Sequence, residues 1–190
     1  IKIMSFIIWI LLLLGSEHFE TKSPNHLDKV TVSGRKILLN ENPYFIKGVC
    51  YHPVPKGETK RSFSTLREDL RLMQEAGINT IRVYEPIDDK LVLDKIAAAG
   101  LKLIVGFGYN QNGKFDILSG TYLDYIKKFK DHKAILFWEL GNEYNYHPEW
   151  FGGDISVWFS AMEQAAVRIR TLDANHPVAT AHGELPDSAT

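Results

Sequence analysis

The sequence predicts an α/β protein: the N-terminal half of a (β/α)₈ barrel, holding its first four to five strands, with a short β-hairpin before it. From about residue 45, short apolar runs alternate with helical apolar stripes, which indicates parallel strands joined by helices. No glycine-rich phosphate loop follows the first run, as a dinucleotide-binding, doubly wound sheet would require. Polar or aromatic residues instead end nearly every predicted strand, which is typical of a barrel whose C-terminal rim carries a site.

The spacing of apolar residues and the positions of turn residues predict each element in order. The predicted strands cover residues 45–51, 79–84, 101–107, 134–140 and 178–181. The predicted helices cover residues 65–76, 91–99, 118–129 and 155–172, and we expect their apolar stripes to face the core and to form no cofactor site. Thr65 and Glu68 have the spacing of a capping box. A whole barrel takes about 250 residues, so we expect these 190 to be a fragment of one.

The N-terminal region predicts export. Residues 1–15 are a short apolar run with one lysine, typical of a signal peptide or a membrane anchor. Residues 16–28 are polar and are interpreted as a tether, and residues 29–44 are expected to form the hairpin. The predicted location is therefore secreted, periplasmic or at the cell surface. We expect membrane contact only through residues 1–15, if they are not cleaved.

Composition limits the partners. The chain is 45% hydrophobic and 24% charged with a net charge of −1, as in an ordinary globular protein. The absence of a basic cluster argues against nucleic acid. The histidines lack metal-ligand spacing, so we predict no metal and no cofactor. Cys50 is the only cysteine and is expected to be a small buried residue of the first barrel strand. The oligomeric state is left open.

The stretch 134–150, AILFWELGNEYNYHPEW, holds the main candidate site. An apolar strand stops at Gly141 and presents Asn142 and Glu143 at its C-terminal end. Four aromatic residues flank Glu143, namely Trp138, Tyr144, Tyr146 and Trp150. Burial among such apolar rings favours the protonated form of a carboxyl group, as a general acid needs, and their flat faces suit the C–H faces of sugar rings. We therefore predict that Glu143 is catalytic, and an ordinary helix-capping or lysine-paired acid is the alternative.

Other residues at strand ends complete the predicted site. Arg82 lies on the second predicted strand, and an ordinary interior ion pair is one interpretation of it. Glu139 is expected to form a core ion pair with Arg82 or a lysine, because a buried acid needs a partner. Glu184 is an acid at the rim after the fifth predicted strand, and Glu85 is weighed as a rim or turn residue. The predicted substrate-binding residues are His52, Tyr84, Tyr109, Trp138, Tyr144, His182 and Glu184.

Together these motifs resemble a known group. The segments FIKGVCYHP, AGINTIRVYEP, AGLKLIVGF, FWELGNEYNYHPEWF and NHPVATAHGE, from about residue 43 to 187, resemble the clan of retaining glycoside hydrolases with a (β/α)₈ barrel, and most of all the catalytic domain of glycoside hydrolase family 2. IRVY and AGLKLIVGF are also similar to β-1,3-glucanosyltransferases. Each motif alone is weakly specific, and the combination is fairly specific.

The resemblance implies roles for three residues. Glu143 matches the family's acid/base, Asn142 the neighbour that hydrogen-bonds the sugar 2-hydroxyl, and Arg82 the arginine that holds the catalytic carboxylates ionised and in place. In this clan the nucleophile is a glutamate on the seventh barrel strand, which these residues do not reach. Glu184, after the fifth strand, is therefore weighed as a nucleophile or as a sugar contact. The implied function is an exported β-glycosidase or transglycosylase acting on oligo- or polysaccharides. The alternatives are a non-catalytic carbohydrate-binding barrel and an inactive half-barrel that pairs with another chain.

Overall fold

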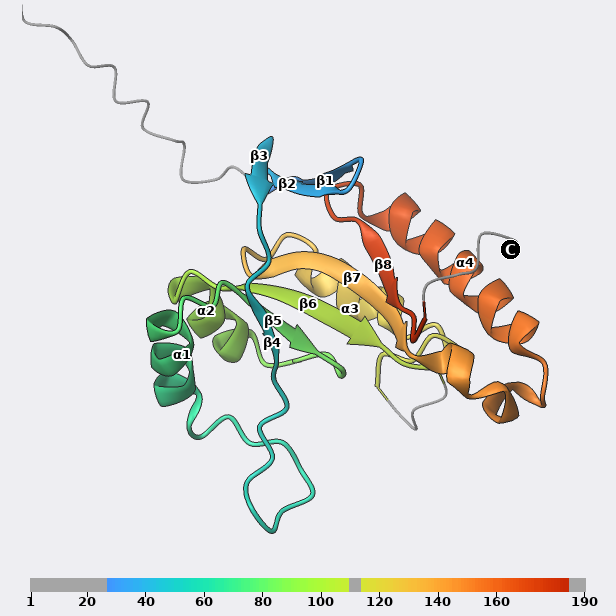
Figure 1. Cartoon of the computed structure of the whole chain (residues 1–190), viewed down its shortest axis with the longest axis horizontal. Helices are drawn as coiled ribbons and strands as arrows, with labels where there is room; N and C mark the ends of the chain where they lie inside the picture. The colour runs from blue at the N-terminus through green and yellow to red at the C-terminus, as the bar shows by residue number, and fades with distance from the viewer. Residues whose placement is uncertain (1–26, 110–113, 185–190) are drawn as a thin grey trace, which may run out of the picture.

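Two β-sheets organise the part of the chain that the computed structural model describes, residues 27–109 and 114–184. An antiparallel sheet has the order β1-β2-β3, and a parallel sheet has the order β4-β5-β6-β7-β8 (Figure 1). The predicted signal peptide or anchor, residues 1–15, and all but the last two residues of the predicted tether lie outside the described residues. None of the helices in the described ranges is long and apolar enough to cross a membrane.

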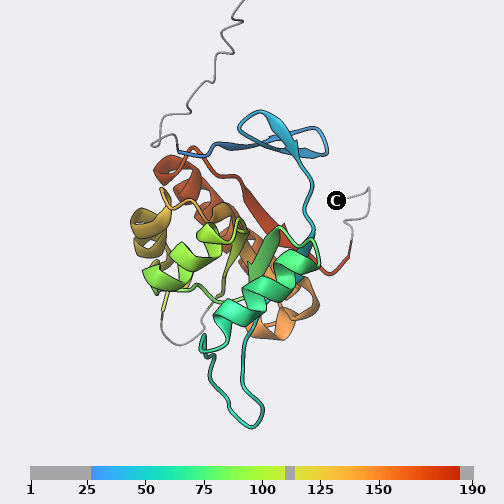
Figure 2. The same ribbon diagram turned by 90° about the vertical axis from the view of Figure 1, so that its left-hand side faces the viewer.

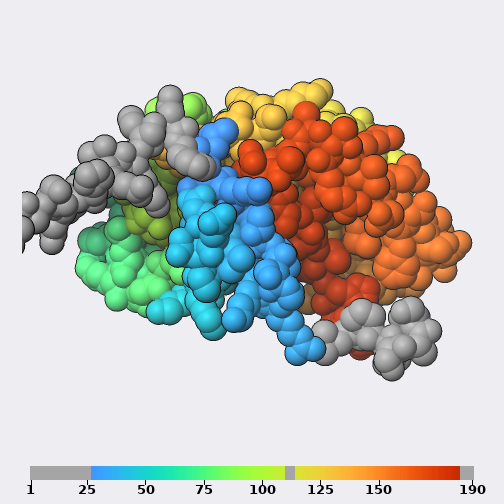
Figure 3. Space-filling view, turned by 90° about the horizontal axis from the view of Figure 1, so that it is seen from above, coloured from blue at the N-terminus to red at the C-terminus, as the bar shows by residue number. Residues whose placement is uncertain are grey.

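The first sheet is a three-stranded meander rather than the predicted two-stranded hairpin. It consists of β1 (Val30–Ser33), β2 (Lys36–Leu39) and β3 (Asn42–Tyr44). Val30 packs in one cluster with Ile104 and Phe137 of the parallel sheet. The Tyr44 hydroxyl donates to the carbonyl oxygen of Asn79, just before β5, at 2.9 Å. The meander therefore covers the N-terminal ends of the parallel strands, where Figure 3 shows it lying across the molecule.

The parallel sheet is wound in one direction. Its elements are β4 (Gly48–Cys50), α1 (Leu66–Glu75), β5 (Thr80–Val83), α2 (Lys90–Ala98), β6 (Lys102–Phe107), α3 (Tyr122–Phe129), β7 (Ile135–Asn142), α4 (Ile155–Leu172) and β8 (Val178–Ala181). The order of the strands in space equals their order in the chain. A doubly wound sheet reverses direction at a switch point, so the fold is a partial (β/α) barrel, as predicted. Figure 2 shows the helices gathered on one side of the sheet.

The core lies between the parallel sheet and its helices. Trp138, Trp158, Tyr122 and Tyr125 are among its largest fully buried side chains. Three residues of the predicted core-facing stripes are instead exposed, namely Leu91, Leu118 and Phe159. Leu91 and Phe159 lie on the solvent-exposed sides of α2 and α4, and Leu118 lies before the start of α3.

Two helix starts differ from the prediction. Helix α3 begins at Tyr122, four residues later than predicted. The Thr65 side chain makes no cap hydrogen bond and donates instead to a carboxylate oxygen of Asp69, so the predicted capping box does not form. The helices α2 and α4 are capped by aspartates. Asp89 accepts from the N–H of Leu91, and Asp154 accepts from the N–H of Ser156. These caps fix where each crossover turns back over the sheet.

Candidate active site

The inner face of the parallel sheet carries a buried ion pair. The strand registers place Cys50, Arg82, Gly106 and Glu139 on the same face of neighbouring strands. The Nε atom of Arg82 donates to both carboxylate oxygens of Glu139, at 3.0 and 2.9 Å, and Nη2 donates to Oε1 as well. Glu139 is 6% exposed. The expected core ion pair of Glu139 therefore forms with Arg82, and the carboxylate raises the pKa of the arginine.

Arg82 also reaches the end of β7. Its Nη2 atom donates to Oδ1 of Asn142 at 2.9 Å, and Nη1 contacts the sulfur of Cys50 at 3.7 Å. The guanidinium carbon lies 4.7 Å from the centre of the Tyr84 ring. Cys50 is exposed rather than buried, because its side chain points to the open inner face and away from the helices. Arg82 thus joins the ends of three strands.

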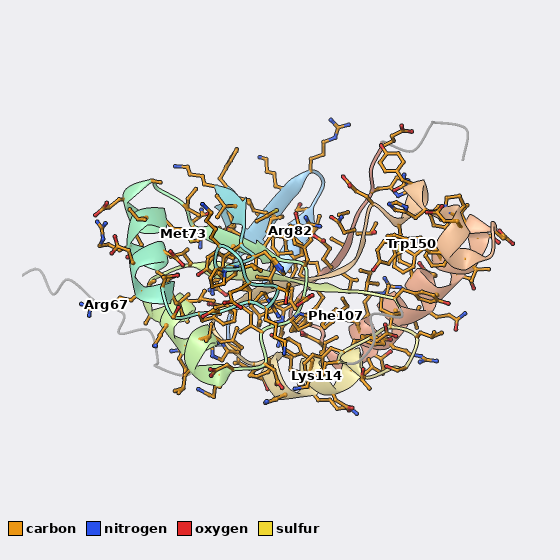
Figure 4. All side chains as sticks on the ribbon, turned by 90° about the horizontal axis from the view of Figure 1, so that it is seen from below. Arg67, Met73, Arg82, Phe107, Lys114 and Trp150 are labelled. Carbon is orange, nitrogen blue, oxygen red and sulfur yellow. The ribbon has the colours of Figure 1, made fainter. Side chains whose placement is uncertain are left out.

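A cavity of about 230 Å³ opens beside this pair. It is lined by Tyr84, Gly106, Phe107, Gly108, Glu139, Gly141, Asn142, Tyr144 and Trp150. Figure 4 shows Arg82 near the middle of the molecule and Trp150 to one side of it. A carboxylate, an amide and exposed aromatic rings around one hollow are suited to binding a polar ring-shaped ligand such as a sugar.

Glu143 directly follows Asn142, the last residue of β7, at the C-terminal rim of the parallel sheet. Its φ of 56° is left-handed, its N–H donates to the Ala181 carbonyl oxygen at 2.8 Å, and its own carbonyl oxygen accepts from Tyr146. A non-glycine residue in this region is uncommon and is held there by its surroundings. Within the described residues Glu143 is exposed, so the expected burial among aromatic rings is wrong for this part of the chain. Arg82 binds the neighbouring Asn142 and the buried Glu139 instead of Glu143.

The segment after Glu143 docks onto the end of β8. It forms two short 3₁₀ helices, η1 (Tyr144–Tyr146) and η2 (Pro148–Phe151). The Tyr146 hydroxyl donates to the Gly183 carbonyl oxygen at 2.7 Å, and the N–H of Gly183 donates to the Asn145 side chain. Loss of hydration, followed by the charges of Glu184 and Glu143, raises the pKa of Tyr146. Glu184 is therefore close to Tyr146 on the same rim as Glu143.

Two predicted substrate-binding residues lie elsewhere. Trp138 is fully buried on the helix side of β7, where its indole N–H donates to Asp173 at 2.8 Å. It cannot contact a ligand on the inner face, because neighbouring residues of a strand point to opposite faces. Tyr109 packs against Phe151 and Trp158 and lines a separate hollow between α3 and α4. Both residues belong to the supporting core rather than to the cavity.

Of the other predicted residues, some line the cavity and some lie outside it. Tyr84 and Tyr144 line the cavity, although the Tyr144 hydroxyl also accepts from the backbone of Tyr109. His52 and His182 are exposed and are not among the lining residues, and His182 lies beside Phe159. Glu85 is at the rim, paired with Arg61 at 3.2 Å.

Trp150 is a further lining residue, and it is one of the aromatic residues near Glu143 whose flat faces were expected to suit a sugar ring. Its ring stacks on His147 at 3.9 Å between centroids, and 55% of the residue remains exposed. Within residues 27–109 and 114–184, no group of three or more His, Cys, Asp or Glu side chains is arranged to hold a metal ion.

The chain is similar in sequence to two enzymes over part of their length. The chain is 23% identical over 128 residues to a β-galactosidase of Pseudoalteromonas haloplanktis, which covers 60% of this chain and 12% of that protein. It is 25% identical over 137 residues to the 1,3-beta-glucanosyltransferase gel1 of Aspergillus fumigatus, covering 64% of this chain and 30% of that protein. The chain thus spans less than a third of either relative.

Solved structures share the fold. A β-glucuronidase of Faecalibacterium prausnitzii superposes with a TM-score of 0.67 at 18% identity, over 84% of this chain and 28% of that one. A β-galacturonidase of Eisenbergiella tayi bound to galacturonate gives 0.59 at 21% identity, over 83% and 29%. The family profile described as "Glycosyl hydrolases family 2, TIM barrel domain" matches residues 30–184. The chain therefore belongs to glycosyl hydrolase family 2, within its TIM barrel domain.

Proposed function

We propose that this chain carries the acid/base half of a retaining β-glycosidase or transglycosylase, with Glu143 as general acid/base. The observation that carries the proposal is Glu143 directly after Asn142, whose amide is bound by Arg82 beside a cavity. The nucleophile is assigned to a later barrel strand that these 190 residues do not include. Family membership supports cleavage of glycosidic bonds, and the retaining mechanism and the residue roles are proposals.

The reaction needs two carboxyl groups about 5 to 5.5 Å apart. Glu143 gives its proton to the glycosidic oxygen as the bond to the anomeric carbon breaks, while the second carboxylate bonds to that carbon. In the second step the Glu143 carboxylate takes a proton from water or a sugar hydroxyl, whose oxygen displaces the enzyme carboxylate. Glu143 is thereby protonated again. The exposed position of Glu143 suits a group that meets leaving groups and acceptors arriving from solvent.

Arg82 and Asn142 bind and orient. The charge of Arg82 is balanced by Glu139, so its main contribution is to hold Asn142 in place. Asn142 is assigned to the sugar 2-hydroxyl, and Tyr84, Tyr144 and Trp150 supply aromatic faces in the cavity. The rim residues Glu184, His52 and His182 remain candidate contacts for sugar units beyond the cavity. The proposed partner is therefore a carbohydrate.

The proposed location is outside the cytoplasm. This proposal is supported by residues 1–15, an apolar run followed by a polar segment.

Hydrolysis and transfer differ only in the acceptor. One curated relative is a β-galactosidase and another a glucanosyltransferase, so water and sugar are both acceptors to be tested.

The leaving group provides the test of Glu143. In the full-length enzyme, Glu143→Gln is expected to lower kcat/KM at least about a hundredfold on an oligosaccharide, because its leaving oxygen needs a proton. The loss on 2,4-dinitrophenyl β-glycosides should be much smaller, because that leaving group departs without protonation. The sugars to be tried are galactose, glucose, glucuronic acid and galacturonic acid.

Glu163→Gln is the matched control for the Glu143 variant. It changes another exposed glutamate to glutamine, on the outer helix α4, and should leave both rates unchanged. Equal losses of the Glu143 variant on both substrate types would contradict the acid role. Sugar binding by the full-length protein without any turnover would instead favour the non-catalytic carbohydrate-binding barrel.

A further inference from the structure

Glu139 is an unexpected residue for its position. It interrupts the buried strand β7, whose other residues from Ile135 to Leu140 are all apolar and buried. Burying a carboxylate is costly unless it is paired, and an apolar residue would usually serve a strand at least as well. Stability alone therefore does not explain why a glutamate is buried at this position, and a functional role is to be sought.

The contacts of Arg82 show what Glu139 controls. The carboxylate is bound by Nε through both of its oxygens and by Nη2 through one, which fixes the plane of the guanidinium. Gly106 lies beside Glu139 in register on the strand between them. A side chain there would place its Cβ 2.8 Å from the Val83 carbonyl oxygen, so the close approach of the backbone of β5 requires glycine at this position.

The fixed guanidinium in turn determines which way the amide of Asn142 faces. Arginine has only donors, so the amide atom that it contacts must be the oxygen, and Oδ1 of Asn142 is at 2.9 Å from Nη2. The NH₂ group of Asn142 then faces away from Arg82. Asn142 is one of the residues that line the cavity. The NH₂ group is therefore the part of the asparagine side chain that remains to donate hydrogen bonds to a ligand there.

We propose that Glu139 is a positioning residue: by fixing Arg82 it turns the Asn142 amide so that its NH₂ group binds an acceptor oxygen of the substrate. This inference rests on the proposed function for the identity of that oxygen, the 2-hydroxyl of the sugar. The ion pair therefore contributes to substrate recognition rather than to folding alone.

Substrates with and without the 2-hydroxyl separate positioning from folding. The probes are the 4-nitrophenyl β-D-hexoside that the full-length enzyme cleaves fastest and its 2-deoxy counterpart. In Glu139→Gln an NH₂ group replaces one carboxylate oxygen. Because NH₂ only donates, the arginine loses its hydrogen bonding to that oxygen and is no longer held through both oxygens. The preference of kcat/KM for the hydroxylated substrate is expected to fall at least about tenfold, with little loss on the 2-deoxy substrate. An equal loss on both substrates, or an unchanged preference, would overturn the proposal.

Two further variants keep this test decisive. Glu163→Gln removes a surface carboxylate that also pairs with an arginine, and it should leave the preference unchanged. If Glu139→Gln does not fold, Glu139→Asp retains the charge but shortens the side chain by one methylene. We expect it to lower the preference selectively, and full preference in that variant would count against positioning.

A structural readout does not depend on activity. In a crystal structure of the full-length Glu139→Gln enzyme, or of Glu139→Asp if only that variant folds, the guanidinium of Arg82 should have left Oδ1 of Asn142. If Arg82 still donates to that oxygen, the proposal is wrong even if activity is lost. If the wild-type enzyme cleaves none of the sugars tried, the proposed function fails, while this structural comparison still decides the role of Glu139.

Discussion

Gly141 is the residue at which β7 stops being an ordinary strand. Its φ of 70° is left-handed, and an added Cβ would lie 2.5 Å from the Trp158 ring. The next two residues are Asn142 and Glu143, so this glycine determines how both side chains leave the strand. The tryptophan packs where a side chain would otherwise be, which ties the turn to helix α4.

The variant Gly141→Ala tests this turn. It should lower the free energy of unfolding by about 2 to 4 kcal/mol, because left-handed strain and a clash with Trp158 add together. Gly152→Ala is the matched control: its φ is 69°, but no atom lies within 4 Å of the added Cβ. That variant should lose only the backbone cost, about 1 to 2 kcal/mol. Urea unfolding of both variants measures the difference, and equal losses would show that the tryptophan contact is unimportant.

For single residues, the sequence predicted which side chains pair better than it predicted which face of the sheet each side chain lies on. The pairing of Glu139 with Arg82 followed from the need of a buried acid for a cation. The burial of Trp138 and the exposure of Cys50 did not follow, because an unbroken apolar run such as β7 contains no alternation that marks its two faces. The stacking of Trp150 on His147 depends on the two 3₁₀ helices, which leave no periodic pattern in the sequence.

At the level of elements, a buried polar group joins α4, β7 and β8. Asp173, just after α4, accepts hydrogen bonds from the Trp138 indole and the N–H of Asn175, and His176 lies 2.8 Å away. Burial acts to raise the pKa of Asp173, but His176 and Trp138 outweigh it, and the pKa lies below the usual value of an aspartate. This group holds the helix against the back of the strand that carries the site.

The lowered pKa predicts a loss of stability in acid. The carboxylate stabilises the fold fully above the unfolded pKa of about 3.9. That contribution is lost as the pH falls through the lower folded pKa. Asp173→Asn should lower the melting temperature at pH 7 and flatten its fall between about pH 5 and pH 2. Thermal melts of both proteins across that range provide the measurement, and parallel curves would contradict the assignment.

The helices and strands were largely predictable from the sequence, and their ends were less so. The fifth strand of the parallel sheet, β8, has the predicted bounds, whereas β7 extends two residues further than predicted. The third strand of the meander was missed because Asn42 and Pro43 have low strand propensity and pair only through the neighbouring β2. Tertiary pairing, which no local pattern records, decided these cases.

At the scale of the whole molecule, the parallel sheet has two open edges. Among the described residues, β4 pairs only with β5, and β8 pairs only with β7. Closure of a barrel would pair both edges, because each carries a row of free backbone donors and acceptors. The order of the strands was predictable from alternation of strands and helices, whereas closure depends on residues beyond those described.

The open edges predict association. Expressed alone, the 190-residue chain should form dimers or larger assemblies whose melting temperature rises with protein concentration, because its edges pair between copies. Light scattering and melts over a wide range of protein concentration measure this. A cooperative, concentration-independent melt of a monomer would contradict it.

Rescue by azide tests the role of Glu143 most directly. In the full-length Glu143→Ala enzyme, an activated aryl β-glycoside should still form the glycosyl-enzyme, but water then lacks a base. Added azide needs no base, so we expect it to restore turnover and to yield the β-glycosyl azide, identified by NMR. An α-glycosyl azide, or no rescue together with unchanged hydrolysis, would contradict Glu143 as the acid/base of a retaining enzyme.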